Sequence, residues 1–199
     1  MGNASPIGTI SFPHVFTPRA PSPGAEERYS VSVIFDETAQ KSPEYQEMKK
    51  AAMQAAIDKW GNKAKDMIKN GQLRMPFRDA SEKSKYQGYE DGKIFINAWS
   101  KQKPDVIDGR LQDVVPSDLY PGCLGRITYN AFAYENSGNR GVSFGLNNLQ
   151  ISDFTTDRLD GKVKGKDDFD QLDMAGSGPS DNQNGDSGSS DDLDDDLPF

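Results

Sequence analysis

One segment of the sequence places aromatic rings and cations at alternate positions. Residues 93–101 read KIFINAWSK, and an extended strand directs its odd and even positions to opposite faces. The even positions are mostly apolar and suit a core, whereas the odd positions are Lys93, Phe95, Asn97, Trp99 and Lys101. Nucleobases stack on exposed rings and flanking cations neutralise phosphates, so this face is predicted to bind a nucleic-acid single strand. In the alternative interpretation both faces are buried, and the two rings fill a second core layer.

The segment after Cys123 repeats this pattern. Its even positions from 126 to 134 carry an arginine, small polar groups and two rings, while its odd positions are apolar or aromatic. We expect Arg126, Phe132 and Tyr134 to continue the binding face. An ordinary exposed face with Phe132 in the core explains the pattern equally well, so both interpretations stay open.

A stretch rich in cations and rings, MPFRDASEKSKYQGYEDGK, precedes the 93–101 strand. It is expected to form a long loop, and loops beside a barrel often hold ligands. Its candidate DNA contacts are Phe77, Arg78, Lys83, Lys85, Tyr86 and Tyr89, and Lys103 and Arg110 form a weaker class. Acidic residues lie among them, so a solvated loop with incidental charges is the alternative.

Enzyme chemistry has little support in the sequence. The chain holds one histidine, His14, and one cysteine, Cys123. This excludes an intramolecular disulfide and nearly excludes a zinc site built from thiolates and imidazoles. No nucleophile–histidine–acid set can be assembled, and the glycine-rich GNRGVSFG lacks the GK[ST] ending of a phosphate loop. We therefore expect a binding protein, not an enzyme, with no cofactor and no metal ion.

Charge divides the chain into two unequal parts. The 199 residues have a formal net charge of -8, yet all 23 lysines and arginines lie at or before Lys166. Residues 1–166 have a net charge of +3, and residues 167–199 contain 11 aspartates and no basic residue. Such asymmetry favours a nucleic acid or another charged partner. We recognise neither a transmembrane segment nor a signal peptide, so we expect a cytoplasmic protein.

Periodicity predicts a mainly β (α+β) domain over residues 1–157. A helix is expected to begin after Ser42 and to end at Gly71, with a kink near Gly61. The expected strands are 7–16, 28–35, 93–101, 124–135 and 141–153. Five strands with one inserted helix fit an OB-fold-like, partly open barrel, and the pattern alone also fits another α+β sheet domain. Residues 158–199 are expected to form an acidic, largely disordered tail, because they offer little surface to bury.

The tail ends in DDLDDDLPF, in which three apolar residues follow a run of acids. A terminal ring suits an apolar pocket on a partner, while the carboxylates steer the encounter. The predicted partner-binding residues are Asp194, Asp195, Asp196, Leu197, Pro198 and Phe199. The same polyanion can fold back on a basic face and compete with phosphate.

These residues resemble a known family. The end DDDLPF is similar to the acidic Asp-Asp-Asp-Ile-Pro-Phe tip of bacterial single-stranded-DNA-binding proteins, with Leu197 in place of Ile. The body resembles a phage-type single-stranded-DNA-binding protein over most of residues 7–154. The stretches that carry this resemblance are ISFPHVFTP, MPFRDASEK, KIFINAWSKQKPDVID, YPGCLGRITYNAFAY and GNRGVSFGLNNLQ.

The resemblance implies an OB-fold body that coats single-stranded DNA without sequence preference during replication, recombination and repair. It also implies that the tail recruits replication proteins such as a polymerase or helicase-primase, and it is compatible with a homodimer. If a phage encodes the protein, its expected location is the cytoplasm of the host cell. Two other classes stay open. One is an acidic interaction protein or DNA mimic that sequesters basic partners without binding DNA, and the other is a metal-dependent nuclease that uses carboxylates of the body.

Overall fold

The computed structural model describes residues 3–136 and 138–162, which form eight strands and five helical segments. The strands are β1 (Asn3–Ala4), β2 (Gly8–Arg19), β3 (Arg28–Phe35), β4 (Arg78–Asp79), β5 (Ile94–Ser100), β6 (Val106–Asp108), β7 (Leu124–Asn136) and β8 (Asn139–Asp153). The helical segments are α1 (Glu37–Gln40), α2 (Pro43–Trp60), η1 (Gly61–Lys63), α3 (Ala64–Lys69) and η2 (Ala80–Lys83). Most of the predicted tail, with its partner-binding tip at 194–199, lies outside the described residues.

Five strands pair in a closed ring, in the order β2–β3–β5–β8–β7 and back to β2. Within the ring the β5–β8 pairing is parallel, and the other four pairings are antiparallel. Two joints are short, because the β5–β8 and β2–β7 ladders each contain two residue pairs. The predicted mainly β fold, with an OB-like set of five strands and one long helix before the third of them, is therefore confirmed.

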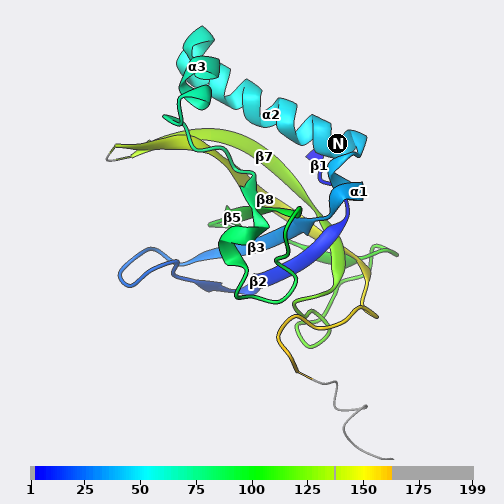
Figure 1. The fold of residues 1–199 in the computed structure, drawn as a ribbon. Helices are drawn as coiled ribbons and strands as arrows, with labels where there is room; N and C mark the ends of the chain where they lie inside the picture. Colours follow the sequence, from blue (N-terminus) through cyan, green and yellow to red (C-terminus); the bar gives the residue numbers. More distant parts are fainter. Residues whose placement is uncertain (1–2, 137, 163–199) are drawn as a thin grey trace, which may run out of the picture. The chain divides into compact units, whose positions relative to one another are not determined.

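Helix α2 begins where the sequence predicts it. The Ser42 hydroxyl accepts a hydrogen bond from the Tyr45 amide at 3.2 Å, and Pro43 occupies the first turn. The side chains of α2 that are buried are Tyr45, Met48, Ala52 and Ala56. They pack against β7 and β8, and Figure 1 shows α2 lying along β7. The predicted kink occurs at Gly61, whose positive φ of 62° ends the helix.

The core has two parts on opposite sides of β3 and β5. The larger part contains the inward side chains of the ring and the buried face of α2. The smaller part uses Ile34 of β3 and Phe95 of β5, which are paired in register and contact Ala80 and Tyr89. Both contacts come from residues 80–92, which we call the covering segment. It lies on one end of the outer face of β3 and β5, the face turned away from the larger core.

The rest of this outer face lies between two hairpins. Figure 1 shows the loop between β2 and β3 and the end of the β7–β8 hairpin projecting to the same side of the molecule. Within residues 3–136 and 138–162, no helix is long and apolar enough to cross a membrane.

Candidate nucleic-acid interface

Two pockets open on the outer face and meet at Asn97, which lines both. The tryptophan pocket, of about 350 Å³, lies over β2, β3 and β5. Its side chains with polar or aromatic groups are Phe12, His14, Arg19, Arg28, Ser30, Ser32, Asn97 and Trp99. The arginine pocket, of about 600 Å³, lies between the chain before β4 and the β7–β8 hairpin. Its side chains with polar or aromatic groups are Arg74, Phe77, Arg78, Glu82, Asn97, Tyr134 and Ser143.

The strand register places Trp99 in the middle of this surface. Trp99 is paired with Ser30 of β3, which is itself paired with His14 of β2, so the three side chains form a row across three strands. The Arg28 guanidinium lies 4.6 Å from the centre of the Trp99 ring, and the Phe132 ring meets it edge-on with centroids 5.7 Å apart. These contacts restrict the rotamer of the half-buried Trp99. A fixed, partly exposed ring beside a cation is suited to stacking on a nucleobase.

Asn97 stands at the junction of the two pockets in a defined orientation. Its side-chain carbonyl accepts a hydrogen bond from the Ser32 hydroxyl at 2.6 Å. Because this bond occupies the oxygen of the amide, its nitrogen is the group left to donate to a ligand. A hydrogen-bond donor at this position suits a phosphate oxygen or a carbonyl of a base.

The two pockets are strongly biased toward positive charge. In the described part of the chain, four arginines line them, whereas the one carboxylate among the lining residues belongs to Glu82. Burial lowers the pKa of His14, and the nearby Arg19 lowers it further, so His14 is mostly neutral in the free protein at pH 7. The chain as a whole is acidic, and the pockets are therefore a local concentration of the body's small positive excess.

A bulge in β2 directs a third ring toward the covering segment. The register of β2 against β3 shifts between Ser11 and His14, and Phe12 within this bulge has a φ of 45°. The Phe12 ring lines the tryptophan pocket and meets the Tyr86 ring edge-on at 5.2 Å. The bulge thus links the pocket to the covering segment, because it turns one side chain toward both.

Lys83 stabilises the contact between the covering segment and the sheet. Its ammonium nitrogen lies 4.6 Å from the centre of the Phe95 ring, 4.9 Å from that of Phe12 and 5.2 Å from that of Tyr89. Burial lowers the pKa of Lys83, an effect that the neighbouring Arg78 reinforces and Glu82 opposes. The sequence predicted a DNA contact at Lys83, which stays a prediction; in this structure its ammonium group holds the covering segment onto three rings.

The structure corrects the predicted exposure of two rings. Phe95 is 0% exposed and Tyr89 is 3% exposed, so neither offers a face to a base in this conformation. The cause is the covering segment, which buries the outer face of β5 at Phe95 but leaves Trp99, four residues further, partly exposed. For the 93–101 strand, the interpretation with a second core layer is thus correct at Phe95, and that of an accessible ring is correct at Trp99.

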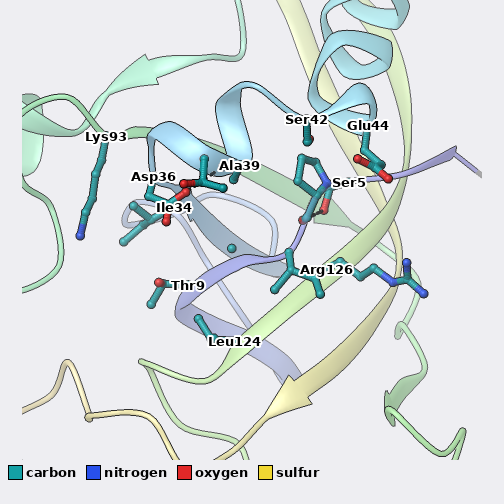
Figure 2. Close-up of a pocket in the computed structure, with 14 residues that line it drawn as sticks. Ser5, Thr9, Ile34, Asp36, Ala39, Ser42, Glu44, Lys93, Leu124 and Arg126 are labelled. Atoms are coloured by element: carbon teal, nitrogen blue, oxygen red, sulfur yellow. Dashed lines mark hydrogen bonds between the residues drawn. The ribbon is translucent and has the colours of Figure 1, made fainter.

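Arg126 and Lys93 do not line the two pockets. They border a separate pocket of about 540 Å³ between α1, the start of α2 and the first residues of β2 (Figure 2). Arg126 donates to the Gln150 side chain at 2.9 Å, and Lys93 pairs with Glu90 at 3.0 Å. Arg126 does share its face of β7 with Phe132, but six residues of strand separate them by roughly 20 Å.

The remaining predicted contacts are spread around the pockets. Phe77, Arg78 and Tyr134 line the arginine pocket, although the half-buried Phe77 ring also packs edge-on against Tyr45 and Phe144 of the core. Lys101 is exposed and pairs with Glu26 at 2.6 Å. The other exposed residues, which line neither pocket, are Lys85, Tyr86, Lys103 and Arg110.

Several lining residues were not predicted as contacts from the sequence. They are Phe12, His14, Arg19, Arg28 and Arg74. A signal existed for Arg28, because it begins the polar alternation Arg28, Ser30, Ser32 that marks the outer face of β3. Arg74 gave no such signal. Its backbone forms a bridge to Gly141 of β8, which is a tertiary pairing that no local pattern encodes.

Comparisons with known proteins agree on one group. A protein-family model described as the single-stranded-DNA-binding protein of Enterobacter phage Enc34 matches residues 8–178. A search of curated protein sequences gives no match to this chain.

Solved structures of two phage proteins have the same fold. The single-stranded-DNA-binding protein from bacteriophage Enc34, solved in complex with single-stranded DNA, aligns with a TM-score of 0.63 and 15% identity, covering 79% of this chain and 88% of that one. The single-stranded-DNA-binding protein gp2.5 of bacteriophage T7 aligns with a TM-score of 0.57 and 15% identity, covering 81% of this chain and 96% of that one. At this identity the likeness establishes the fold.

Proposed function

This chain belongs to the family of phage single-stranded-DNA-binding proteins that the Enc34 protein represents, and we propose that it binds and coats single-stranded DNA through the tryptophan and arginine pockets. The family is one of binding proteins, not enzymes. The observation that carries the proposal is the meeting of the two pockets at Asn97, with partly exposed rings and four arginines around them. A strand crossing both pockets would place bases against Trp99 and Tyr134 and its phosphates near the arginines.

Binding without sequence preference follows from the chemistry of these side chains. Every base has a π-face, so stacking on a ring tolerates all four bases, whereas discrimination needs several hydrogen bonds to base edges. Asn97 and the serines of β3 supply few donors, and arginines make contacts that any phosphate satisfies. We therefore propose that the protein protects or organises single strands during phage DNA replication, recombination and repair.

The tail is proposed to recruit other proteins. The sequence of residues 194–199, three aspartates followed by Leu-Pro-Phe, offers an apolar end behind a set of charges that steer the encounter. Replication proteins with a basic rim around an apolar pocket, such as a polymerase or helicase-primase, fit this end. The 11 aspartates beyond residue 166 also give the tail the charge needed to compete with DNA for the arginines.

A fluorescence titration with poly-dT tests these proposals. Trp60 and Trp99 are the two tryptophans of the chain, so Trp60→Phe leaves Trp99 as the single emitter. Trp60 is the last residue of α2 and packs against the larger core, which makes Phe a mild replacement. The titration compares the full chain with a chain ending at Met174, at two salt concentrations. We expect quenching of Trp99, weaker binding in salt and tighter binding by the shorter chain.

The outcomes separate the interpretations. Binding by both chains with these trends supports a coating protein with a competing tail. Equal affinity of the two chains would refute the competition but not the DNA binding. Failure of both to bind at low salt would refute the proposed function and favour an acidic protein that sequesters basic partners.

A further inference from the structure

An ion pair stands inside the arginine pocket. The Arg78 guanidinium donates from both Nε and Nη2 to the same carboxylate oxygen of Glu82, with the Nε contact at 3.0 Å. Both residues line the pocket, and their side chains are 45% and 44% exposed. Two donors on one oxygen direct the hydrogen-bonding edge of Arg78 at Glu82. A phosphate that enters the pocket therefore meets an arginine whose Nε and Nη2 groups already donate to an anion, so that two of its five N–H donors are engaged.

The chain places Glu82 firmly at this position. The Asp79 carboxylate accepts from the Ser81 amide at 2.8 Å and caps η2, in which Glu82 lies. Ala80 is fully buried, and its amide donates to the carbonyl of Lys93 at 2.9 Å. The next residue, Lys83, is held over three rings. The backbone on either side of Glu82 is thus anchored, so the carboxylate stays within reach of Arg78.

Toward a guanidinium, the Glu82 carboxylate offers the same kind of anionic acceptor as a phosphate. Both groups present anionic oxygens that accept hydrogen bonds from the guanidinium edge. Glu82 is the one carboxylate among the residues that line the two pockets in the described part of the chain. The other three lining arginines lie outside this pair. The pocket thus contains one internal anion, and that anion occupies one particular cation.

We propose that Glu82 is an internal competitor for the DNA phosphate at Arg78, and that it lowers the affinity of the arginine pocket for the strand. This inference rests on the proposed function. A bound phosphate takes the donors of Arg78 and displaces Glu82, which then remains nearby as a like charge. The pair is half exposed, and such pairs are weak, so the displacement is possible and the pocket still binds. The contact between Arg78 and the DNA phosphate would then form and break readily. Such a weak contact suits a protein that must later be removed from DNA.

The test measures affinity for labelled oligo-dT at several salt concentrations with the full chain. Glu82→Gln keeps the shape and a hydrogen-bond acceptor but removes the charge. We expect about fivefold tighter binding, the order of effect when an exposed ion pair no longer has to be broken. The slope of log K against log salt should become steeper by about 0.7, because one more phosphate is neutralised by an uncompensated cation. In the Glu82→Gln background, Arg78→Gln should abolish this gain in affinity. In the wild type, the same substitution should lower the affinity by a smaller factor, because Glu82 already occupies Arg78.

A matched control uses a similar pair elsewhere. Glu47 pairs with Lys50 at 2.7 Å on the exposed side of α2, and neither residue lines either pocket. Glu47→Gln changes the net charge by the same amount and should leave the salt slope unchanged. Equal gains from both variants would assign the effect to net charge and overturn the proposal, as would unchanged or weaker binding by a folded Glu82→Gln. If the wild type itself does not bind oligo-dT, the proposed function fails first.

Discussion

Trp99 should contribute more binding free energy than any other ring of the outer face. It lies between a cation 4.6 Å from its centre and the edge of a second ring, so its orientation is set before DNA arrives. A base that stacks on such a ring contributes roughly 1–3 kcal/mol, as alanine substitutions in other single-strand-binding proteins indicate. Little of this stacking free energy is lost in ordering the side chain, because its rotamer is already restricted. We therefore expect Trp99→Ala to weaken binding by a factor of about 5 to about 150.

The assay is fluorescence anisotropy of a labelled dT oligonucleotide, with a thermal melt to confirm that each variant is folded at the titration temperature. Trp60→Phe is the control, since Trp60 packs against the core at the end of α2 and should affect DNA affinity little. Replacement of Trp99 by Phe should recover part of the lost affinity, because a smaller ring still stacks. A folded Trp99→Ala protein that binds within twofold of the wild type would refute the assignment of Trp99 as the stacking platform.

Two further predictions concern the packing beside the arginine pocket and the pH dependence of stability. Gly141→Ala should lower the melting temperature and weaken DNA binding, because the added Cβ would lie 2.3 Å from the carbonyl oxygen of Arg74. Gly109→Ala should change neither, since the added Cβ would have no atom of residues 3–136 and 138–162 within 4 Å. His14 has a lowered pKa in the folded protein, so the unfolded chain binds its proton more readily and stability should fall as the pH drops through about 6.5. Thermal melts between about pH 7.5 and pH 5.5 should show a smaller loss for His14→Gln, and an equal loss would contradict this prediction.

Local patterns predicted the elements of the fold well. The helix start at Ser42 follows from a side-chain acceptor, a proline and an acidic first turn, all of which act within four residues. The alternation along residues 93–101 likewise assigned the correct side to Trp99, because strand geometry imposes a period of two whatever the fold. These features depend on neighbours in the sequence, so the sequence is sufficient to find them.

The parts that escaped prediction depend on contacts between distant segments. Phe95 satisfies the same alternation as Trp99, but the covering segment buries one and leaves the other accessible. Arg126 satisfies the alternation of β7, yet the length of that strand carries it to a different pocket (Figure 2). Arg74 has no pattern at all and reaches its pocket through a backbone bridge to β8. Alternation therefore identifies a face, and the tertiary structure decides which part of it a ligand can reach.

The distribution of charge in the body also depends on the tertiary structure. An excess of three positive charges over 166 residues would not by itself attract a polyanion strongly. The fold makes the excess effective, because four arginines line two pockets that meet at Asn97. Three of them belong to β2, β3 and β4, and the fourth lies in the chain before β4. Most of the body's carboxylates lie elsewhere, and the exception, Glu82, is paired with one of those arginines. Affinity for a strand is then set by which cations the fold gathers and which it neutralises, so single charges in the pockets should matter more than the net charge of the chain.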